Sequence, residues 1–278
     1  MKTSFGNMFS DIHNVELEQL MSDFLRLQVN VSFKKHKGFM MTHGLDTSKR
    51  VLDVGTGNGY FCGKLAQLSP HMQFIGIDFK KEMIDEAMKT QATQGLSNVQ
   101  WLHEDITNLS PQFLSKKKEY FDGVIFRFVL VHIKEVESVL KTTRQLLKPN
   151  GMVWFFSIEL DYMNSEPQYP EFELYKRATE KLYRTFGING HLGGRLPAML
   201  KKAGYRDIYL EKDSMSKEEI GLENYQRFML SEAALFHRYA PNSITKKELE
   251  VLTRFATEIV PKPHYHATYG NVMISARQ

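Results

Sequence analysis

The amino-acid sequence predicts an α/β fold in which a parallel β-sheet carries helices on both faces. Five short runs rich in Val, Ile and Phe alternate with amphipathic segments, and they span residues 50–54, 74–78, 99–103, 123–128 and 151–158. The runs are continuously apolar, which is typical of strands buried on both faces. Strands that alternate with helices are joined by right-handed crossovers, so they lie parallel to one another.

Helices are predicted before, between and after these strands. Apolar residues recur at helical spacing over 14–43, 81–91 and 134–147, and a Pro-Asn-Gly sequence stops the last of these segments. After the fifth strand, Pro170 stands at the first turn of a helix that we expect to run from residue 171 to Gly187.

The segment 214–260 separates the last two predicted strands, 207–212 and 271–276. It holds two further predicted helices, so a long helical insertion interrupts a β-hairpin. An insertion of this length inside a compact domain is usually functional, and we interpret it as part of a lid. The helix starts have capping-box spacing at Ser216 with Glu219 and at Thr245 with Glu248.

Composition excludes several classes of protein. The 278 residues are 42% hydrophobic and 24% charged, which is typical of a globular chain and excludes a disordered one. The net charge of +4 is too mild to indicate nucleic acid as a partner. The single cysteine, Cys62, cannot form an internal disulfide and favours a reducing compartment. With no signal-peptide pattern and no apolar run long enough to span a membrane, we expect a cytoplasmic protein.

A glycine-rich turn follows the first predicted strand. Residues 51–59 read Val-Leu-Asp-Val-Gly-Thr-Gly-Asn-Gly and lead into a predicted helix. Glycines allow a tight turn and let a ligand approach the backbone, while the helix start offers unsatisfied N–H groups. The third glycine comes one residue too early for the dinucleotide pattern, and Tyr60 stands where that pattern requires glycine.

Carboxylates follow the next strands at intervals that favour a nucleotide-type ligand. Asp78 ends the second strand, where a carboxylate can bridge two ribose hydroxyls, and Asp105 follows the third strand. Asp122 opens the fourth strand. Each of these residues alone is more often a cap or a turn residue. Their occurrence in this order and at these intervals, however, favours a ligand-binding site at the edge of the sheet.

With these motifs, the chain resembles the class I S-adenosylmethionine-dependent methyltransferases, in particular the group that acts on small molecules. The resemblance covers residues 45–160 and extends more loosely through 190–205. It implies a Rossmann-like, doubly wound, seven-stranded sheet whose last strand is antiparallel. The domain organisation that we expect is an N-terminal helical arm (1–45), a cofactor-binding core (46–160), a helical lid insertion (161–190), and the end of the core sheet (191–278) with a second insertion at 214–262.

The resemblance also implies which residues bind S-adenosylmethionine and release S-adenosylhomocysteine. The methionine part of the cofactor would face Asp53, Gly55, Thr56, Gly57, Asn58 and Gly59, and its sulfonium would lie over Arg127 and Phe128. The ribose and the adenine would be held by Asp78, Phe79, Met83, Asp105 and Ile106. Thr56 replaces the cysteine or serine that is usual in the glycine turn, a mild departure.

Catalytic groups are harder to identify, because methyl transfer depends mainly on alignment of donor and acceptor. His132 after the fourth strand and Glu159 after the fifth are the candidates for a general base, although helix or strand capping would explain either one. His264 and His266 are too weak a pattern to predict a metal, so we expect no metal site.

The acceptor is predicted to be a small molecule, either aromatic or hydrophobic, because the helical insertions are rich in aromatic residues. An RNA- or protein-modifying methyltransferase and a non-catalytic methyltransferase-like binding protein stay open as alternatives, as do a monomer and a homodimer. Residues 127–130 lack the Pro-Pro motif of enzymes that methylate DNA and protein amide nitrogens. The aromatic residues of the insertions are Tyr162, Tyr169, Phe172, Tyr175, Tyr183, Phe186, Tyr225, Phe228, Phe236 and Tyr239.

Overall fold

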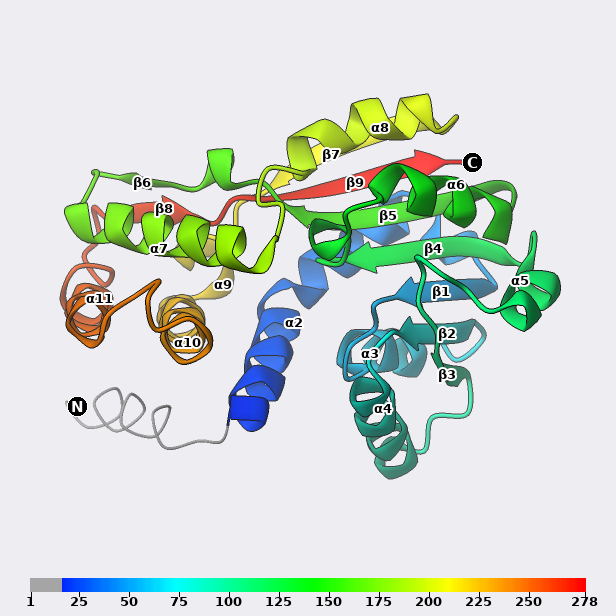
Figure 1. Ribbon diagram of the computed structural model, residues 1–278, viewed down its shortest axis with the longest axis horizontal. Coiled ribbons are helices and arrows are strands. Elements are labelled where there is room, and N and C mark those ends of the chain that lie inside the picture. Colours follow the sequence, from blue (N-terminus) through cyan, green and yellow to red (C-terminus); the bar gives the residue numbers. More distant parts are fainter. Residues whose placement is uncertain (1–16) are drawn as a thin grey trace. The chain divides into compact units, whose positions relative to one another are not determined.

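The computed structural model describes residues 17–278, and these form two compact units (Figure 1). One unit, which we call the sheet unit, comprises Phe33–Ile158, His191–Lys212 and Val272–Gln278. The other, the helical unit, comprises the described residues up to Ser32, together with Glu159–Gly190 and Asp213–Asn271. Residues 14–16 of the predicted N-terminal helix lie outside the described part of the chain.

A seven-stranded sheet forms the centre of the sheet unit, with the strand order β3-β2-β1-β4-β5-β9-β7. β1 to β5 are parallel where their pairing is recorded, and the sheet as a whole is mixed, with one antiparallel strand (Figure 1). The predicted fold class is therefore confirmed. The strands are β1 (Arg50–Val54), β2 (Gln73–Asp78), β3 (Val99–His103), β4 (Phe121–Arg127), β5 (Leu147–Ile158), β7 (Arg206–Asp213) and β9 (Asn271–Arg277).

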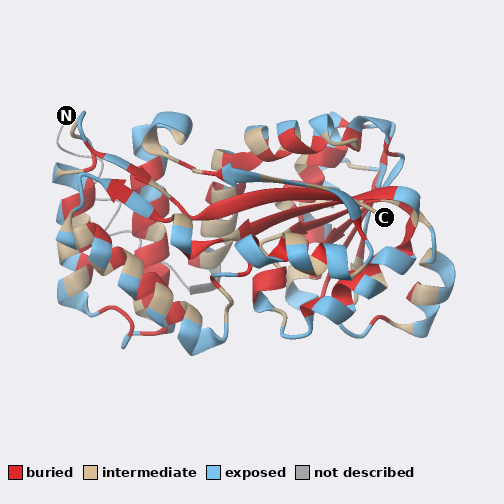
Figure 2. Cartoon of the chain, turned by 90° about the horizontal axis from the view of Figure 1, so that it is seen from above, coloured by how far each residue is buried: buried red, intermediate tan, exposed pale blue. Residues whose placement is uncertain are grey.

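Burial explains why the predicted strands lack alternation. β1 and β4 bury most of their residues in continuous runs, as Figure 2 shows for the strands of the sheet, because helices cover them. The helices of this unit, besides the second part of α2 (Leu17–Thr42), are α3 (Tyr60–Leu68), α4 (Lys81–Gln94), α5 (Pro111–Lys117), α6 (Val136–Leu146) and α8 (Leu196–Lys202).

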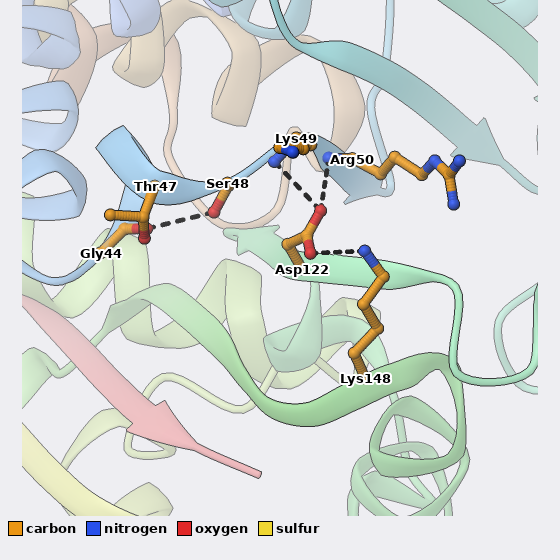
Figure 3. A network of polar contacts seen from close by, with 7 residues as sticks. All are labelled: Gly44, Thr47, Ser48, Lys49, Arg50, Asp122 and Lys148. Atoms are coloured by element: carbon orange, nitrogen blue, oxygen red, sulfur yellow. Dashed lines mark hydrogen bonds and ion pairs between the residues drawn. The ribbon is translucent and has the colours of Figure 1, made fainter.

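Asp122 belongs to a structural network at the start of β4. Its Oδ2 accepts hydrogen bonds from the backbone N–H groups of Lys49 and Arg50 at 3.0 and 2.8 Å, and Lys148 Nζ donates to its Oδ1 at 2.6 Å (Figure 3). Beside it, Ser48 Oγ donates to the Gly44 carbonyl (Figure 3). Asp122 thus joins β1, β4 and β5 where β1 and β4 begin, at the opposite end from Asp78 and the glycine turn.

The helical unit contains α7 (Pro170–Phe186), α9 (Lys217–Ile220), α10 (Leu222–Tyr239), α11 (Lys246–Glu258) and the first part of α2. A short antiparallel pair, β6 (Asn164–Glu166) and β8 (His266–Thr268), was not predicted from the sequence. In α2, Leu20 packs with Ala234 and Leu235 of α10, and Phe24 lies 5.2 Å from Phe228 between ring centroids. The amphipathic pattern of α2 is explained here by packing.

Two predicted helix starts have different outcomes. Thr245 and Glu248 form the full capping box at the start of α11, so that prediction is confirmed. Ser216 also caps a helix, but α9 is only four residues long, because the chain turns at Gly221 with φ 84° before α10 begins. The segment 214–260 therefore holds three helices, where the sequence predicted two.

Candidate active site

The glycine turn after β1 has the backbone that its sequence requires. Gly55 and Gly59 have φ angles of 65° and 71°, a region that strongly favours glycine. A Cβ at Gly55 would lie 2.4 Å from Val129 Cγ2, so a larger residue would also clash with the chain after β4. The turn is compact, and its backbone N–H groups lie at the start of α3.

Asp53, the last but one residue of β1, lies buried beneath this turn. Its Oδ2 accepts a hydrogen bond from Thr56 Oγ1 at 2.7 Å. Burial raises the pKa of Asp53 to about 7, although the Thr56 hydrogen bond and the charge of Arg127 both lower it. Near neutral pH this carboxyl group can therefore exist in either protonation state.

Asp78 connects the end of β2 to the glycine turn. Its Oδ2 accepts a hydrogen bond from the Gly57 N–H, and its Oδ1 accepts one from the Lys80 N–H, both at 2.9 Å. A carboxylate oxygen has two lone pairs, so each oxygen retains the capacity to accept another hydrogen bond. Asn58 is buried in the same turn and donates from Nδ2 to Glu86 Oε1 of α4 at 3.2 Å.

The residues predicted to face adenine follow β2 and β3. Phe79 is a large apolar side chain with 63% of its surface exposed, and Met83 is half-buried on α4. Asp105 is exposed, and its Oδ1 accepts hydrogen bonds from both the N–H and the hydroxyl of Thr107 at 2.8 Å. Ile106 beside it is buried. An exposed aromatic ring and an exposed carboxylate at neighbouring strand ends suit an adenine ring with its exocyclic amino group.

Arg127 ends β4, and Phe128 follows it. The strand was predicted to include Phe128, but Phe128 has a φ of 57°, so the chain turns there into a conformation that is uncommon for a bulky residue. The Arg127 guanidinium lies over two rings, 5.2 Å from the centroid of Phe61 and 4.9 Å from that of Phe128.

The two predicted catalytic residues lie in different units. His132 ends a short 3-10 helix (Leu130–His132) of the sheet unit, and its side chain is exposed. Desolvation by the surrounding protein atoms disfavours the charged imidazolium and lowers the pKa of His132 below its ordinary value, and the positive charge of Lys80 lowers it further. Glu159 belongs to the helical unit, where it is buried and its backbone N–H donates to the Gly270 carbonyl at 2.7 Å. His132 is therefore placed among residues of the sheet unit, and Glu159 among residues of the helical unit.

Sequence reasoning missed His36 in the sheet unit. This side chain of α2 is fully buried and stacks on Phe156 of β5 with ring centroids 4.0 Å apart, while Phe128 lies 6.1 Å away. Its helical position among apolar neighbours is the only signal in the sequence, and that signal is also typical of a core residue.

Sequence reasoning also missed Glu232 in the helical unit. This α10 residue is buried, and its carboxylate accepts a hydrogen bond from the Tyr175 hydroxyl of α7. The hydroxyls of Tyr175 and Tyr269 lie 2.9 Å apart, so they extend the network. Burial raises the pKa of Glu232 to about 7, against the opposing effect of the Tyr175 hydrogen bond.

The aromatic residues of the helical unit are mainly packing groups. Phe172, Tyr175 and Tyr225 are almost completely buried. Phe186 and Tyr239 are instead exposed and contact each other edge-on, 6.5 Å apart. His264 and His266 have separate partners, Tyr169 Oη at 3.5 Å and Glu218 Oε1 at 3.0 Å.

Together, the mixed seven-stranded sheet, the glycine turn after β1 and the acidic residues after β2 and β3 define an α/β enzyme fold with a nucleotide-type binding edge. Comparison with known families is consistent with this class. The chain belongs to the methyltransferase domain family, whose model matches residues 45–204. The resemblance drawn from the sequence is thereby confirmed for the family.

Individual relatives are more distant. The chain is 30% identical over 115 residues to a ubiquinone biosynthesis O-methyltransferase of Coxiella burnetii, which covers 41% of this chain and 45% of that protein. It is 27% identical over 146 residues to a demethylmenaquinone methyltransferase of Geobacillus kaustophilus, covering 51% and 60%. The matches thus span about half the length of these relatives.

A solved structure shares the fold over most of the chain. Phosphoethanolamine N-methyltransferase 2 of Haemonchus contortus, in complex with S-adenosyl-L-methionine, superposes with a TM-score of 0.56 and 18% identity over 83% of this chain and 48% of that protein. None of the helices within residues 17–278 is long and apolar enough to cross a membrane.

Proposed function

We propose that the protein is an S-adenosylmethionine-dependent methyltransferase that acts on a small-molecule acceptor. One observation carries the proposal: in a chain of the methyltransferase domain family, the glycine turn, Asp78 and Asp105 follow successive strands of one sheet. Ligands of doubly wound sheets bind at this edge, beyond the carboxyl ends of the strands.

The residues present fit the cofactor. Asp78 is fixed by two backbone N–H groups and keeps lone pairs for two ribose hydroxyls. Phe79 offers an exposed ring for the adenine, and Met83 would flank it from α4. Asp105 would accept a hydrogen bond from the adenine amino group, beside the backbone of Ile106.

The methionine part of the cofactor would lie along the glycine turn. Gly55 and Gly57 are partly exposed there, Gly59 lies buried at the start of α3, and the buried Asp53 would interact with the amino group through water. We assign Arg127 and Phe128 to the neighbourhood of the sulfonium.

When bound, the cofactor supplies an activated methyl group for an in-line displacement. The chain must therefore mainly align the acceptor, and alignment of this kind accounts for roughly 7–11 kcal/mol of a barrier. His132 would accept the acceptor's proton where the acceptor must lose one, since its lowered pKa keeps it neutral at pH 7. Glu159 is the second candidate for this role.

The acceptor that we propose is a small aromatic or hydrophobic compound. The relatives named above are methyltransferases of ubiquinone biosynthesis and of demethylmenaquinone, which supports this class of acceptor. The role of the helical unit as a lid, and the domain boundaries given above, stay predictions.

Transfer of a labelled methyl group tests the proposal. The protein would be incubated with methyl-labelled S-adenosylmethionine and a panel of phenols, hydroquinones and small amines, with RNA and a protein extract as further acceptors. Label in a small molecule is expected, and Asp78→Ala should lose most of it at limiting cofactor. Label only in RNA or protein would contradict the acceptor class, and cofactor binding with no transfer to any acceptor would favour a non-catalytic binding protein.

A further inference from the structure

Trp101 of β3 lies in register with the floor of the candidate cofactor site. Asp53 of β1 pairs with Gly76 of β2, and Gly76 pairs with Trp101. Residues paired across parallel strands point to the same face of a sheet, so Asp53 and Trp101 share one face with a glycine between them. Only 4% of the surface of Trp101 is exposed.

The indole of Trp101 fills the space that two glycines leave open. A Cβ on Gly76 would lie 2.4 Å from Trp101 Cζ3, and a Cβ on Gly59 would lie 2.8 Å from Trp101 Cη2. Gly59 is the last glycine of the turn, and its missing Cβ would also meet Ala87 of α4 at 2.8 Å. The six-membered ring of the indole therefore lies against both β2 and the glycine turn.

The indole N–H of the same side chain makes no hydrogen bond to the described part of the chain in this position. Trp101 Nε1 is buried and has no hydrogen-bond partner within the described residues. An unsatisfied buried donor costs about 1–3 kcal/mol. Phenylalanine would avoid that cost, but its single ring extends less far from the backbone and could not reach both glycines. The advantage of tryptophan here is its size.

Trp154 of β5 provides a comparison within the same sheet. It also lies over a strand glycine, since a Cβ on Gly123 would be 2.3 Å from Trp154 Cζ3. Its Nε1, in contrast, donates to the His43 carbonyl at 3.1 Å. The contacts recorded for Trp154 involve no residue of the glycine turn, so it is a matched structural tryptophan.

We propose that Trp101 is a positioning residue for the cofactor site. Its indole packs between Gly59 of the glycine turn and Gly76 of β2, and so fixes the distance of the turn from β2. At the end of β2, Asp78 accepts the hydrogen bond from the Gly57 N–H. The effect of Trp101 on cofactor affinity rests on the proposed function, whereas its packing against the glycine turn does not. A residue that acts in this way changes cofactor affinity, because the turn N–H groups must be in place before the ligand binds.

The first test measures cofactor affinity in Trp101→Phe and Trp154→Phe by calorimetric titration with S-adenosylhomocysteine. Trp101→Phe should raise the Kd roughly tenfold, as expected for a small displacement of binding groups, and leave kcat at saturating cofactor within about twofold of wild type. Trp154→Phe should leave the Kd within about twofold. Equal weakening by both variants would overturn the proposal, because it would indicate a general loss of sheet stability.

The second test needs no cofactor. Amide hydrogen exchange would be measured at Thr56, Gly57 and Gly59, whose N–H groups are bonded to the Ile77 carbonyl, Asp78 and the Thr56 carbonyl. Trp101→Phe should accelerate exchange at these amides about tenfold or more, and Trp154→Phe should not. Unchanged exchange in Trp101→Phe would refute the support of the turn. If the wild-type protein binds no S-adenosylhomocysteine while Trp101→Phe still accelerates exchange at these amides, the proposed function alone is refuted.

Discussion

The buried carboxylate of Glu232 should make the helical unit less stable as the pH rises. Its pKa is raised from 4.5 to about 7 by burial. The Tyr175 hydroxyl donates to it, and Tyr183, Tyr225 and Tyr269 are the other titratable groups that interact with its charge. Between the two pKa values of Glu232 an unfolded chain loses the proton while the folded protein keeps it. The gap corresponds to about 3 kcal/mol of unfolding free energy, which is fully present below pH 4.5 and lost by about pH 7.

Glu232→Gln removes this titration and keeps an oxygen that can accept from Tyr175. Urea unfolding followed by circular dichroism between pH 5 and 8 should show that the variant gains stability relative to wild type as the pH rises, by up to about 3 kcal/mol at pH 8. Glu248→Gln serves as the control, since the hydrogen bonds from Thr245 lower the pKa of Glu248, so its contribution is lost only below about pH 4.5 and its difference from wild type should stay constant between pH 5 and 8. A stability difference between Glu232→Gln and wild type that stays constant from pH 5 to pH 8 would refute the reasoning.

Three further predictions concern the sheet unit. Asp78→Asn should weaken S-adenosylmethionine binding at least tenfold in calorimetry while the circular dichroism spectrum stays unchanged, and wild-type affinity would contradict the ribose assignment. His132→Gln should lower kcat by about 10²-fold or more with little change in cofactor Kd, and should abolish the fall in kcat that wild type shows on acidification, at a pH below the ordinary histidine range because the pKa of His132 is lowered; a variant that keeps the wild-type kcat and its pH profile would make His132 a structural residue. Asp122→Ala should cost about 1–3 kcal/mol in urea unfolding at pH 7, because two backbone N–H groups and Lys148 lose their acceptor, and any loss of cofactor affinity in the folded variant would count against its purely structural role.

The sheet could be predicted because its signal is local. Each strand is a short apolar run. The turn between β1 and α3 needs glycines because its backbone has positive φ angles, so it can be recognised within one short segment. The capping box of Thr245 and Glu248 is equally local, since it depends on two residues three positions apart.

What could not be predicted depends on contacts between distant segments. Glu232 resembles any other glutamate of an amphipathic helix until α7 brings Tyr175 against it. Asp122 opens a parallel strand, so its place in the sequence already indicates the end of the sheet opposite Asp78. Its partners Lys49, Arg50 and Lys148, however, come together only through the pairing of β1, β4 and β5. The pair β6 and β8 is three residues long on each side, too short for a period-two pattern to be recognised.

Calorimetric titration of the wild-type protein with S-adenosylmethionine, S-adenosylhomocysteine and NAD tests the central claim most directly. Micromolar binding of the first two and none of NAD is the result expected from the glycine turn, Asp78 and Asp105. Binding of NAD in place of S-adenosylmethionine, or binding of S-adenosylmethionine that survives in Asp78→Ala unchanged, would contradict the assignment of this sheet edge.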